Sequence, residues 1–322
     1  MPSEDLTRAA ALLRAGRLVA FPTETVYGLG ANALDPAAVR RIFEVKGRPS
    51  TSPLIVHVNS PAMARLYVTE WPEAAGLLAA RWWPGPLTLV LPKAAAIPDI
   101  ATAGLATVGL RVPAHPLALE LIGAAGIPVA APSANRFGQL SPVTAEHVRA
   151  ALGAEVDMVL DGGPATVGIE STVLSLAGRS PALLRPGVIR LSEIEALIGP
   201  VAAAPVPAGA HASPGMHSSH YKPATRLVLA REGVLPLAGR GAYLWLTGPA
   251  AGATSIAMPR EAPDYAAALY GVLHDLDREG LDWIAVEAPP ETEEWAGVLD
   301  RLKRAASVQP AAETRTTSPL ND

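Results

Sequence analysis

An uncharged, proline-rich segment divides the chain of 322 residues into two unequal parts. Residues 199–216, GPVAAAPVPAGAHASPGM, contain no Asp, Glu, Lys or Arg, and their apolar residues show no helical period. A Pro-, Ala- and Gly-rich segment of this kind is typical of a semi-rigid linker. The parts on either side, of roughly 200 and 100 residues, are each long enough to bury a core, so we expect two domains.

Before this segment, short apolar runs alternate irregularly with amphipathic patterns. The runs at 18–21, 53–58 and 107–113 predict strands, and patterns such as the one at 3–16 predict helices. The Gly-containing stretch at 22–32, PTETVYGLGAN, is interpreted as a turn. This alternation favours a mixed α/β domain.

The part after the segment has the pattern of a second, smaller α/β domain. Strand-like runs at 226–230, 241–247 and 282–288 alternate with helical patterns at 262–279 and 293–305. We therefore expect a first domain at 1–200, a linker at 201–224, a small domain at 225–306 and a flexible tail at 307–322.

Composition excludes several classes of protein. Hydrophobic residues make up 49% of the chain and charged residues 17%, which is typical of a globular protein. Cys is absent, which excludes disulfides, thiolate catalysis, iron–sulfur clusters and Cys-ligated zinc. A formal net charge of −4 argues against electrostatic wrapping of nucleic acid. Because charges, Pro and Gly interrupt every apolar stretch, we expect a cytoplasmic protein without a membrane partner.

Several catalytic motifs are missing. The sequence has no G-x-x-x-x-G-K-[ST] phosphate loop, no G-x-S-x-G elbow and no H-E-x-x-H helix. Gly28 and Gly30 match only a fragment of a dinucleotide fingerprint, which lacks its third Gly. These absences exclude the common nucleotide-hydrolysing, serine-hydrolase and metalloprotease patterns.

Polar clusters follow several predicted elements. Thr25 lies after the first strand, where its hydroxyl can bind an anion or cap the turn. Lys46 and Arg48 flank a Gly at a helix end, where they either hold a polyanion or interact with the helix dipole. Ser133 and Asn135 follow an apolar strand, where they either bind a ligand or form a turn.

Other candidate residues lie within predicted strands or at their ends. His57 and Arg111 each interrupt a short apolar strand, so each needs a partner or a ligand. Ser171 enters a later strand, and Arg185 ends another. The polar and aromatic residues of 213–223, at the end of the linker, are expected to dock onto the first domain.

Eight short motifs occur in one order along the chain. They are PTETVYGLG, KGRP, PLIVHV, GLRVP, APSAN, GIESTV, LLRPG and SPGM followed by HYKP. Together they resemble the L-threonylcarbamoyladenylate synthase family in its two-domain form. The resemblance implies a YrdC-like α/β catalytic domain with a twisted mixed sheet, joined by the linker to a smaller, Rossmann-like α/β domain.

The resemblance also implies an enzyme, a nucleotidyltransferase. It would condense L-threonine, bicarbonate and ATP to threonylcarbamoyl-AMP and pyrophosphate, for the threonylcarbamoyl modification of a tRNA adenosine. A carbamate formed on the amine of threonine would attack the α-phosphorus of ATP. This chemistry needs no protein nucleophile, only groups that hold anions together and offset developing charge.

Roles for individual residues follow from the same resemblance. Lys46 and Arg48 match a K-x-R pair that would act on the triphosphate as the catalytic residues. The positions expected around ATP are Lys46, Arg48, Thr107, Ser133, Asn135, Ser141, Arg185 and Tyr221. The positions expected around threonine are Thr25, His57, Arg111 and Ser171. Mg²⁺ would bind through the ATP phosphates, with Ser133 and Asn135 as candidate ligands.

Expected partners include more than the small molecules. The labile product implies a downstream tRNA threonylcarbamoyl transferase as its recipient, whereas direct binding of tRNA is the weaker expectation. The segment at 213–223 is interpreted as a lid that excludes water from the site. At 217–219 the sequence has His-Ser-Ser where family members usually carry basic and aromatic residues. This departure weakens the expected grip of the linker on the nucleotide or makes it pH-sensitive.

Two other functions fit parts of the pattern. An RNA-binding YrdC-like module is one alternative, although the acidic balance and the few aromatic–basic pairs argue against it. A different carbamoyl-adenylate-forming enzyme is the other. Enzymes of the hydrogenase-maturation type carry Cys-rich zinc segments, and this chain has no Cys.

Overall fold

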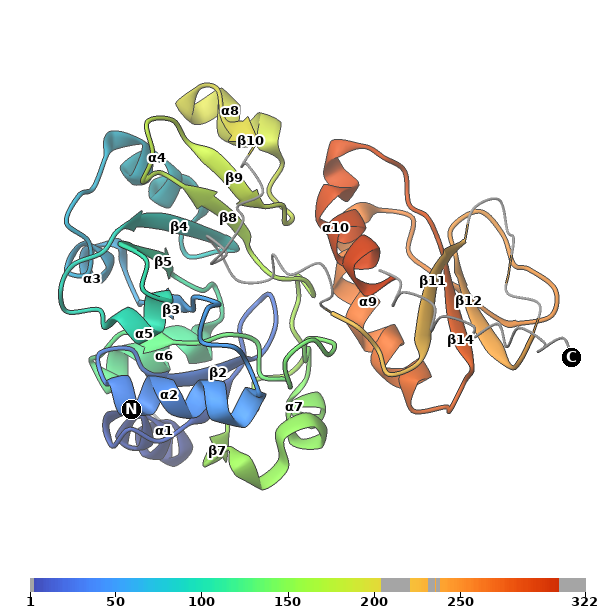
Figure 1. The fold of residues 1–322 in the computed structure, drawn as a ribbon, viewed down its shortest axis with the longest axis horizontal. Coiled ribbons are helices and arrows are strands. Elements are labelled where there is room, and N and C mark those ends of the chain that lie inside the picture. Colours follow the sequence, from blue (N-terminus) through green and yellow to red (C-terminus); the bar gives the residue numbers. More distant parts are fainter. Residues whose placement is uncertain (1–2, 204–220, 231–234, 236–237, 307–322) are drawn as a thin grey trace, which may run out of the picture.

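The computed structural model describes residues 3–203, 221–230, 235 and 238–306 (Figure 1). Much of the expected linker, with the departure at 217–219, and the expected tail lie outside the described residues. The described residues form two lobes, each built around a sheet of its own. The mixed α/β class predicted from the pattern is confirmed.

A ten-stranded mixed sheet forms the frame of the first lobe. Its strand order is β10-β9-β8-β4-β5-β3-β6-β2-β1-β7. The strands are β1 (Val19–Phe21), β2 (Gly28–Asn32), β3 (Ile55–His57), β4 (Leu87–Pro92), β5 (Thr107–Arg111), β6 (Val129–Ala130), β7 (Met158–Val159), β8 (Thr172–Ser175), β9 (Ala182–Arg185) and β10 (Ala202–Ala203). β3 runs parallel to β5, whereas β4 runs antiparallel to it, so the sheet joins segments far apart in the sequence.

Helices cover this sheet. They are α1 (Glu4–Arg14), α2 (Pro36–Lys46), α3 (Pro61–Arg65), α4 (Glu73–Trp82), α5 (Asp99–Thr102), α6 (Pro116–Ala125), α7 (Ala145–Leu152), η1 (Gly153–Glu155) and α8 (Leu191–Ile198). Ser3 caps α1 and Asp35 caps α2, each accepting a hydrogen bond from a first-turn N–H. Within the described part of the chain, no helix has the length and apolar character needed to cross a membrane.

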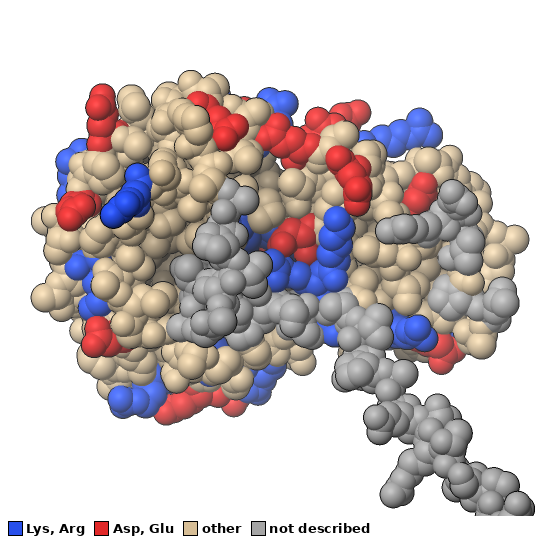
Figure 2. Space-filling view, turned by 45° about the horizontal axis from the view of Figure 1, so that its top comes forward, with Lys and Arg blue, Asp and Glu red and all other residues tan. Residues whose placement is uncertain are grey.

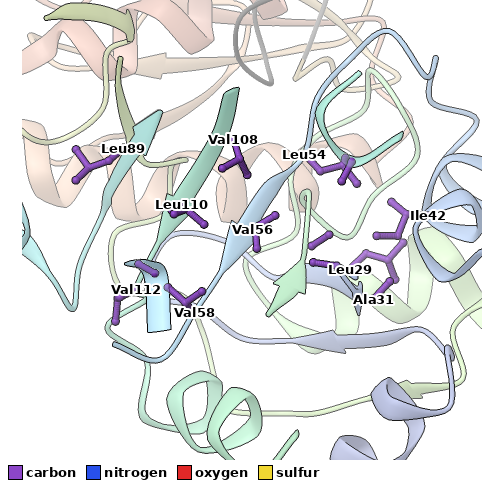
Figure 3. Close-up of a cluster of buried hydrophobic side chains, with 14 of the residues drawn as sticks. Leu29, Ala31, Ile42, Leu54, Val56, Val58, Leu89, Val108, Leu110 and Val112 are labelled. Carbon is purple, nitrogen blue, oxygen red and sulfur yellow. The ribbon is translucent and has the colours of Figure 1, made fainter. Parts of the chain in front are cut away.

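Alternation along the strands gives the two faces of the sheet different environments. Val56 of β3 and Leu110 of β5 point into the main core (Figure 3). Their neighbours His57 and Arg111 point to the opposite face, because successive side chains of a strand alternate. At one end of that face, α1 and α6 pack over a second apolar cluster. The remainder of the face carries polar side chains, among them His57, Arg111 and Thr88, together with apolar ones such as Ile55 and Val90.

The prediction of a turn at 22–32 is wrong for its second half, where the structure has strand β2. This buried strand pairs with β1 on one side and β6 on the other. A Cβ on Gly30 would lie 2.8 Å from Cε1 of Phe21 and 2.9 Å from Cγ1 of Val129. Glycine is needed there so that these side chains can pack across the strand, and the glycines made the segment resemble a turn.

The second lobe is built on a four-stranded parallel sheet with the order β11-β14-β12-β13. Its elements are β11 (Arg226–Ala230), β12 (Gly241–Trp245), β13 (Thr254–Ala257), α9 (Ala262–Asp277), β14 (Trp283–Glu287), η2 (Glu293–Trp295) and α10 (Ala296–Ala305). Strand β13 was not predicted. It is a partly exposed edge strand without a clear apolar alternation.

The two lobes meet closely. A Cβ on Gly297 of α10 would lie 2.6 Å from the carbonyl oxygen of Gly187, so only glycine fits this crossing. The rings of His147, on α7, and His274, on α9, stack with centroids 3.9 Å apart. Burial and the neighbouring His274 lower the pKa of His147 to about 4, so this ring is neutral at pH 7.

The packing around β2 predicts the effect of a methyl group. Replacing Gly30 by Ala should lower the free energy of unfolding by about 1–3 kcal/mol. The new Cβ would overlap the ring of Phe21, a methyl group of Val129 and the backbone oxygen of Val19. Urea unfolding measures the change. In the matched control Gly123→Ala, on α6, the nearest atom to the new Cβ is 3.5 Å away, so stability should be kept or raised. Equal effects of the two substitutions would contradict this account.

The His147–His274 contact predicts a pH dependence of stability. The unfolded chain takes up protons near the ordinary pKa of 6.5, whereas folded His147 does so only near 4. Lowering the pH from 7 to 5 should therefore lower the midpoint of thermal unfolding. In His147→Gln this decrease should be smaller, as calorimetry at several pH values would show. Parallel pH profiles for the two proteins would rule out this role of the pair.

Candidate active site

A pocket opens on the face of the large sheet that carries His57 and Arg111, between the first lobe and Tyr221. It is lined by Thr23, Thr25, Val26, Gly28, Arg48, Ile55, His57, Arg111, Ala131, Pro132, Ser133, Glu170, Ser171, Arg185 and Tyr221. The pocket thus combines residues from the predicted polar clusters, although these clusters lie far apart in the sequence.

Arg111, at the end of β5, is fixed by three protein groups. Its Nη2 lies 2.7 Å from Oε1 of Glu24, its Nη1 donates to Oγ1 of Thr25 at 2.9 Å, and its Nε donates to the carbonyl of Gly85 at 3.2 Å. The other oxygen of Glu24 accepts a hydrogen bond from the backbone N–H of Ala114. The need for a partner, inferred from a charge inside an apolar strand, is thus met largely by Glu24.

His57 lies beside Arg111, in register on the parallel strand β3. Its ring contacts the ring of Phe21 edge-on, with centroids 6.0 Å apart. Burial and the charge of Arg111 lower the pKa of His57 to about 3, so the imidazole is neutral. Its buried Nδ1 has no hydrogen-bond partner among the described residues. An unpartnered buried polar atom in a pocket wall is suited to contact a bound molecule.

The two basic residues of the K-x-R pair point in different directions. Gly47 ends α2 in a left-handed conformation, with φ of 61°, and the chain reverses there. Lys46 does not line the pocket. Its Nζ donates to the carbonyl of Ser133 at 2.5 Å and also to that of Asn135. Burial and the charge of Arg48 hold the pKa of Lys46 well below its usual value. Lys46 therefore fixes the loop at 133–135.

Arg48 lines the pocket itself. Its Nη2 donates to Oγ of Ser52 at 2.5 Å and to the carbonyl of Pro53 at 3.1 Å. Burial lowers the pKa of Arg48 to about 10, so the guanidinium remains charged at neutral pH. Its partners are neutral oxygens, which solvate the charge without cancelling it. The interpretation of this pair as a solvated helix cap is wrong, since both side chains are buried.

Ser171 and Arg185 lie together where β8 and β9 meet. Nε of Arg185 donates to the carbonyl of Ser171 at 3.1 Å, and Nη2 donates to its hydroxyl at 3.2 Å. That hydroxyl also shares a hydrogen bond with Oγ1 of Thr88, at 2.8 Å. Burial lowers the pKa of Arg185, but the guanidinium stays charged. Residues expected around ATP and around threonine are therefore in direct contact.

Besides Lys46, three of the expected ATP-site residues lie outside the pocket lining. Thr107 begins β5, in a small neighbouring cavity that shares Ile55 with the pocket. Ser141 lies behind the wall, and its hydroxyl donates to Oε1 of Glu170 at 2.5 Å. The amide nitrogen of Asn135 donates to two backbone carbonyls of its own loop, and its Oδ1 lies 3.4 Å from Nζ of Lys46.

The donor set is informative about a metal ion. Among the described residues, no group of three His, Asp or Glu side chains is placed to hold a metal. Oδ1 of Asn135 faces Lys46, so the structure does not favour this residue as a ligand. Ser133 remains on the pocket wall. These residues fit a Mg²⁺ ion held chiefly by phosphate oxygens rather than by a protein cage.

Sequence reasoning missed the carboxylates of the site. Glu24 and Glu170 were quoted within motifs but given no role, and Arg301 was not considered. A buried Arg needs a partner, and this need was a usable signal for a carboxylate such as Glu24. No local signal marked Arg301, because an Arg on an amphipathic helix is normally exposed.

Comparisons with known proteins agree with this architecture. A family model described as "Telomere recombination", for Sua5, YciO and YrdC proteins, matches residues 11–187. A second model, described as "Threonylcarbamoyl-AMP synthase, C-terminal domain", matches residues 189–307. The threonylcarbamoyl-AMP synthase of Pyrococcus abyssi is 41% identical over 315 residues, which cover 92% of this chain and 93% of that protein.

Two further relatives are similar over most of their length. The threonylcarbamoyl-AMP synthase of Bacillus subtilis is 43% identical over 324 residues, 94% of this chain and 93% of that protein. The crystal structure of P. abyssi Sua5 complexed with L-threonine matches with a TM-score of 0.87 and 39% identity, covering 95% of this chain and 96% of that one. The chain therefore belongs to the threonylcarbamoyl-AMP synthase family, in the form that has both the Sua5/YciO/YrdC domain and the C-terminal domain.

Proposed function

We propose that the chain is a nucleotidyltransferase that converts L-threonine, bicarbonate and ATP to threonylcarbamoyl-AMP and pyrophosphate. The observation that carries the proposal is the pocket in which three guanidinium groups, those of Arg48, Arg111 and Arg185, converge beside the neutral imidazole of His57. Such a pocket is suited to several anionic groups at once. The names of the relatives and the threonine complex support the same reaction.

The reaction divides into two bond-forming steps. The amine of threonine takes up bicarbonate with loss of water, or CO₂ with loss of a proton, and becomes a carbamate. A carbamate oxygen then attacks the α-phosphorus of ATP, and the bond from this phosphorus to the bridging oxygen breaks as pyrophosphate leaves. Both nucleophile and leaving group come from the substrates, so the protein contributes position and charge. The absence of Cys from the sequence is consistent with this requirement.

Each substrate is assigned to one part of the pocket. We place threonine beside Arg111, Thr25, His57 and Ser171, where the guanidinium of Arg111 has N–H groups beyond the three used by Glu24, Thr25 and Gly85. We place the triphosphate beside Arg48, Arg185 and Ser133. Lys46 would act there mainly through the loop at 133–135, which it fixes.

Several further elements of the proposal depend on this placement. Mg²⁺, when bound to the triphosphate beside Ser133, would offset negative charge that develops on the phosphates. Tyr221, near the end of the linker, would cover the nucleotide. The product would pass to an enzyme that transfers the threonylcarbamoyl group to a tRNA adenosine, which also implies a cytoplasmic location.

The proposed reaction predicts a strict dependence on all three substrates. With purified full-length protein and Mg²⁺, pyrophosphate release should require L-threonine, bicarbonate and ATP together, and mass spectrometry should detect the mixed anhydride. Arg48→Met should lower the rate by at least about tenfold, because a charge-assisted contact to phosphate is lost. Arg40→Met, which removes an exposed charge from the adjoining helix α2, is the matched control and should keep the wild-type rate. Pyrophosphate release without threonine would contradict the proposal. Equal rates of release for Arg48→Met and Arg40→Met would also contradict it.

The threonine end of the pocket predicts a selective binding defect. Arg111→Lys keeps the charge but loses the planar group that contacts Glu24 and Thr25. The dissociation constant for L-threonine should rise by about tenfold or more, and that for an ATP analogue by less. Calorimetric titration of each ligand separates the two effects. Unchanged threonine affinity would exclude this placement.

A further inference from the structure

An arginine of the second lobe reaches into the wall of the pocket. Arg301, on α10, is 1% exposed. Its Nε donates to Oε2 of Glu170 at 2.9 Å, and its Nη2 donates to the carbonyl of the same residue at 3.0 Å. Its Nη1 donates to the carbonyl of Pro186 at 2.6 Å. These contacts fix the residues that immediately adjoin Ser171 and Arg185 in the sequence.

Glu170 is the carboxylate that Arg301 holds, and it lines the pocket. It also accepts hydrogen bonds from the hydroxyls of Ser141, at 2.5 Å, and Tyr270, at 3.3 Å. Burial raises the pKa of Glu170, but the charges of Arg301 and Arg185 and the hydrogen bonds outweigh this effect and leave the pKa below its usual value. The carboxyl group is therefore ionised at neutral pH.

An ionised carboxylate is unfavourable in a pocket that takes anions. Without a nearby cation, the negative charge on Glu170 would repel a triphosphate bound in the same pocket, because like charges are poorly screened in a buried site. The ion pair with Arg301, together with the charge of Arg185, offsets this repulsion, and Asp300 holds the same guanidinium at 3.1 Å. Other basic and acidic side chains lie at the surface where the two lobes meet (Figure 2).

Arg301 also contacts Tyr221, near the end of the linker. Its guanidinium carbon lies 5.5 Å from the centre of the Tyr221 ring, in cation–π geometry. The Tyr221 ring also lies beside that of Tyr270, with centroids 6.1 Å apart. Tyr221 is buried and has a positive φ of 63°, so the surrounding contacts must hold it in an unfavourable backbone conformation.

We propose that Arg301 and Tyr270 of the second lobe are positioning residues of the pocket. Arg301 neutralises and orients Glu170 and, with Tyr270, holds Tyr221 against the site. The nucleotide end of the pocket is then complete only when the second lobe is docked. This inference rests on the proposed function, since it assumes that the pocket binds ATP. It gives the second lobe a specific task in substrate binding, beyond adding buried surface.

A double-mutant cycle separates this role from a purely structural one. The variants are Arg301→Met, Glu170→Gln and the two combined, with Lys303→Met, an exposed cation on the same helix, as matched control. Measurements are the KM for ATP and kcat of pyrophosphate release, the affinity for an ATP analogue, and thermal unfolding. Arg301→Met should raise the KM for ATP by about tenfold or more, with a smaller change in kcat. In the double variant, Glu170→Gln should return the KM for ATP to within about threefold of wild type, because it removes the carboxylate charge that Arg301→Met leaves unpaired.

The outcomes distinguish failure of the inference about Arg301 from failure of the proposed function. If the wild type binds ATP and Arg301→Met leaves the KM unchanged, or if Glu170→Gln fails to restore it in a folded double variant, the inference is wrong. If Arg301→Met does not fold, Arg301→Lys takes its place and should raise the KM severalfold, since it keeps the charge but loses the fork. An unchanged KM in Arg301→Lys would likewise overturn the inference. If the wild type itself neither binds ATP nor releases pyrophosphate, it is the proposed function that fails.

Discussion

Burial of positive charge is the constraint on which the rest of this structure depends. Arg48, Arg111 and Arg185 are each less than a tenth exposed, yet all three line one pocket. A buried cation needs partners, and the chain supplies many of them as neutral oxygens from serine, threonine and the backbone. Such oxygens solvate a charge without cancelling it. The pocket therefore retains an excess of positive charge that anionic substrates can compensate.

Much of this site could be predicted from the sequence, for reasons that are physical. Arg111 and His57 each interrupt an apolar strand, so each was expected to need a partner or a ligand. The identity of the partner Glu24 could not be predicted, because it depends on how the chain turns after β1. Strand β2 was missed because its glycines, required by the packing of Phe21, resemble a turn. Lys46 was expected to act on the triphosphate, and its contact with the loop at 133–135 was not predicted.

The contribution of the second lobe was the least predictable feature. Arg301 lies on an amphipathic helix, where a charged residue normally faces water, and only the docking of α10 buries it. That docking depends on the close approach of Gly297 to Gly187, which has no signature in either segment alone. The wall of the pocket thus contains a contact between Glu170 and Arg301, which are 131 positions apart in the sequence. A local reading of motifs identifies the catalytic lobe but not the parts that complete it.

A crystal structure of the full-length protein with L-threonine and a non-hydrolysable ATP analogue is the most direct test of the central claim. The account predicts both ligands in the pocket lined by Arg48, Arg111 and Arg185, with the amine of threonine facing the α-phosphate. It also predicts that the Arg301–Glu170 ion pair persists beside them. Ligands bound at separate surfaces, or a triphosphate bound away from the three arginines, would contradict the account.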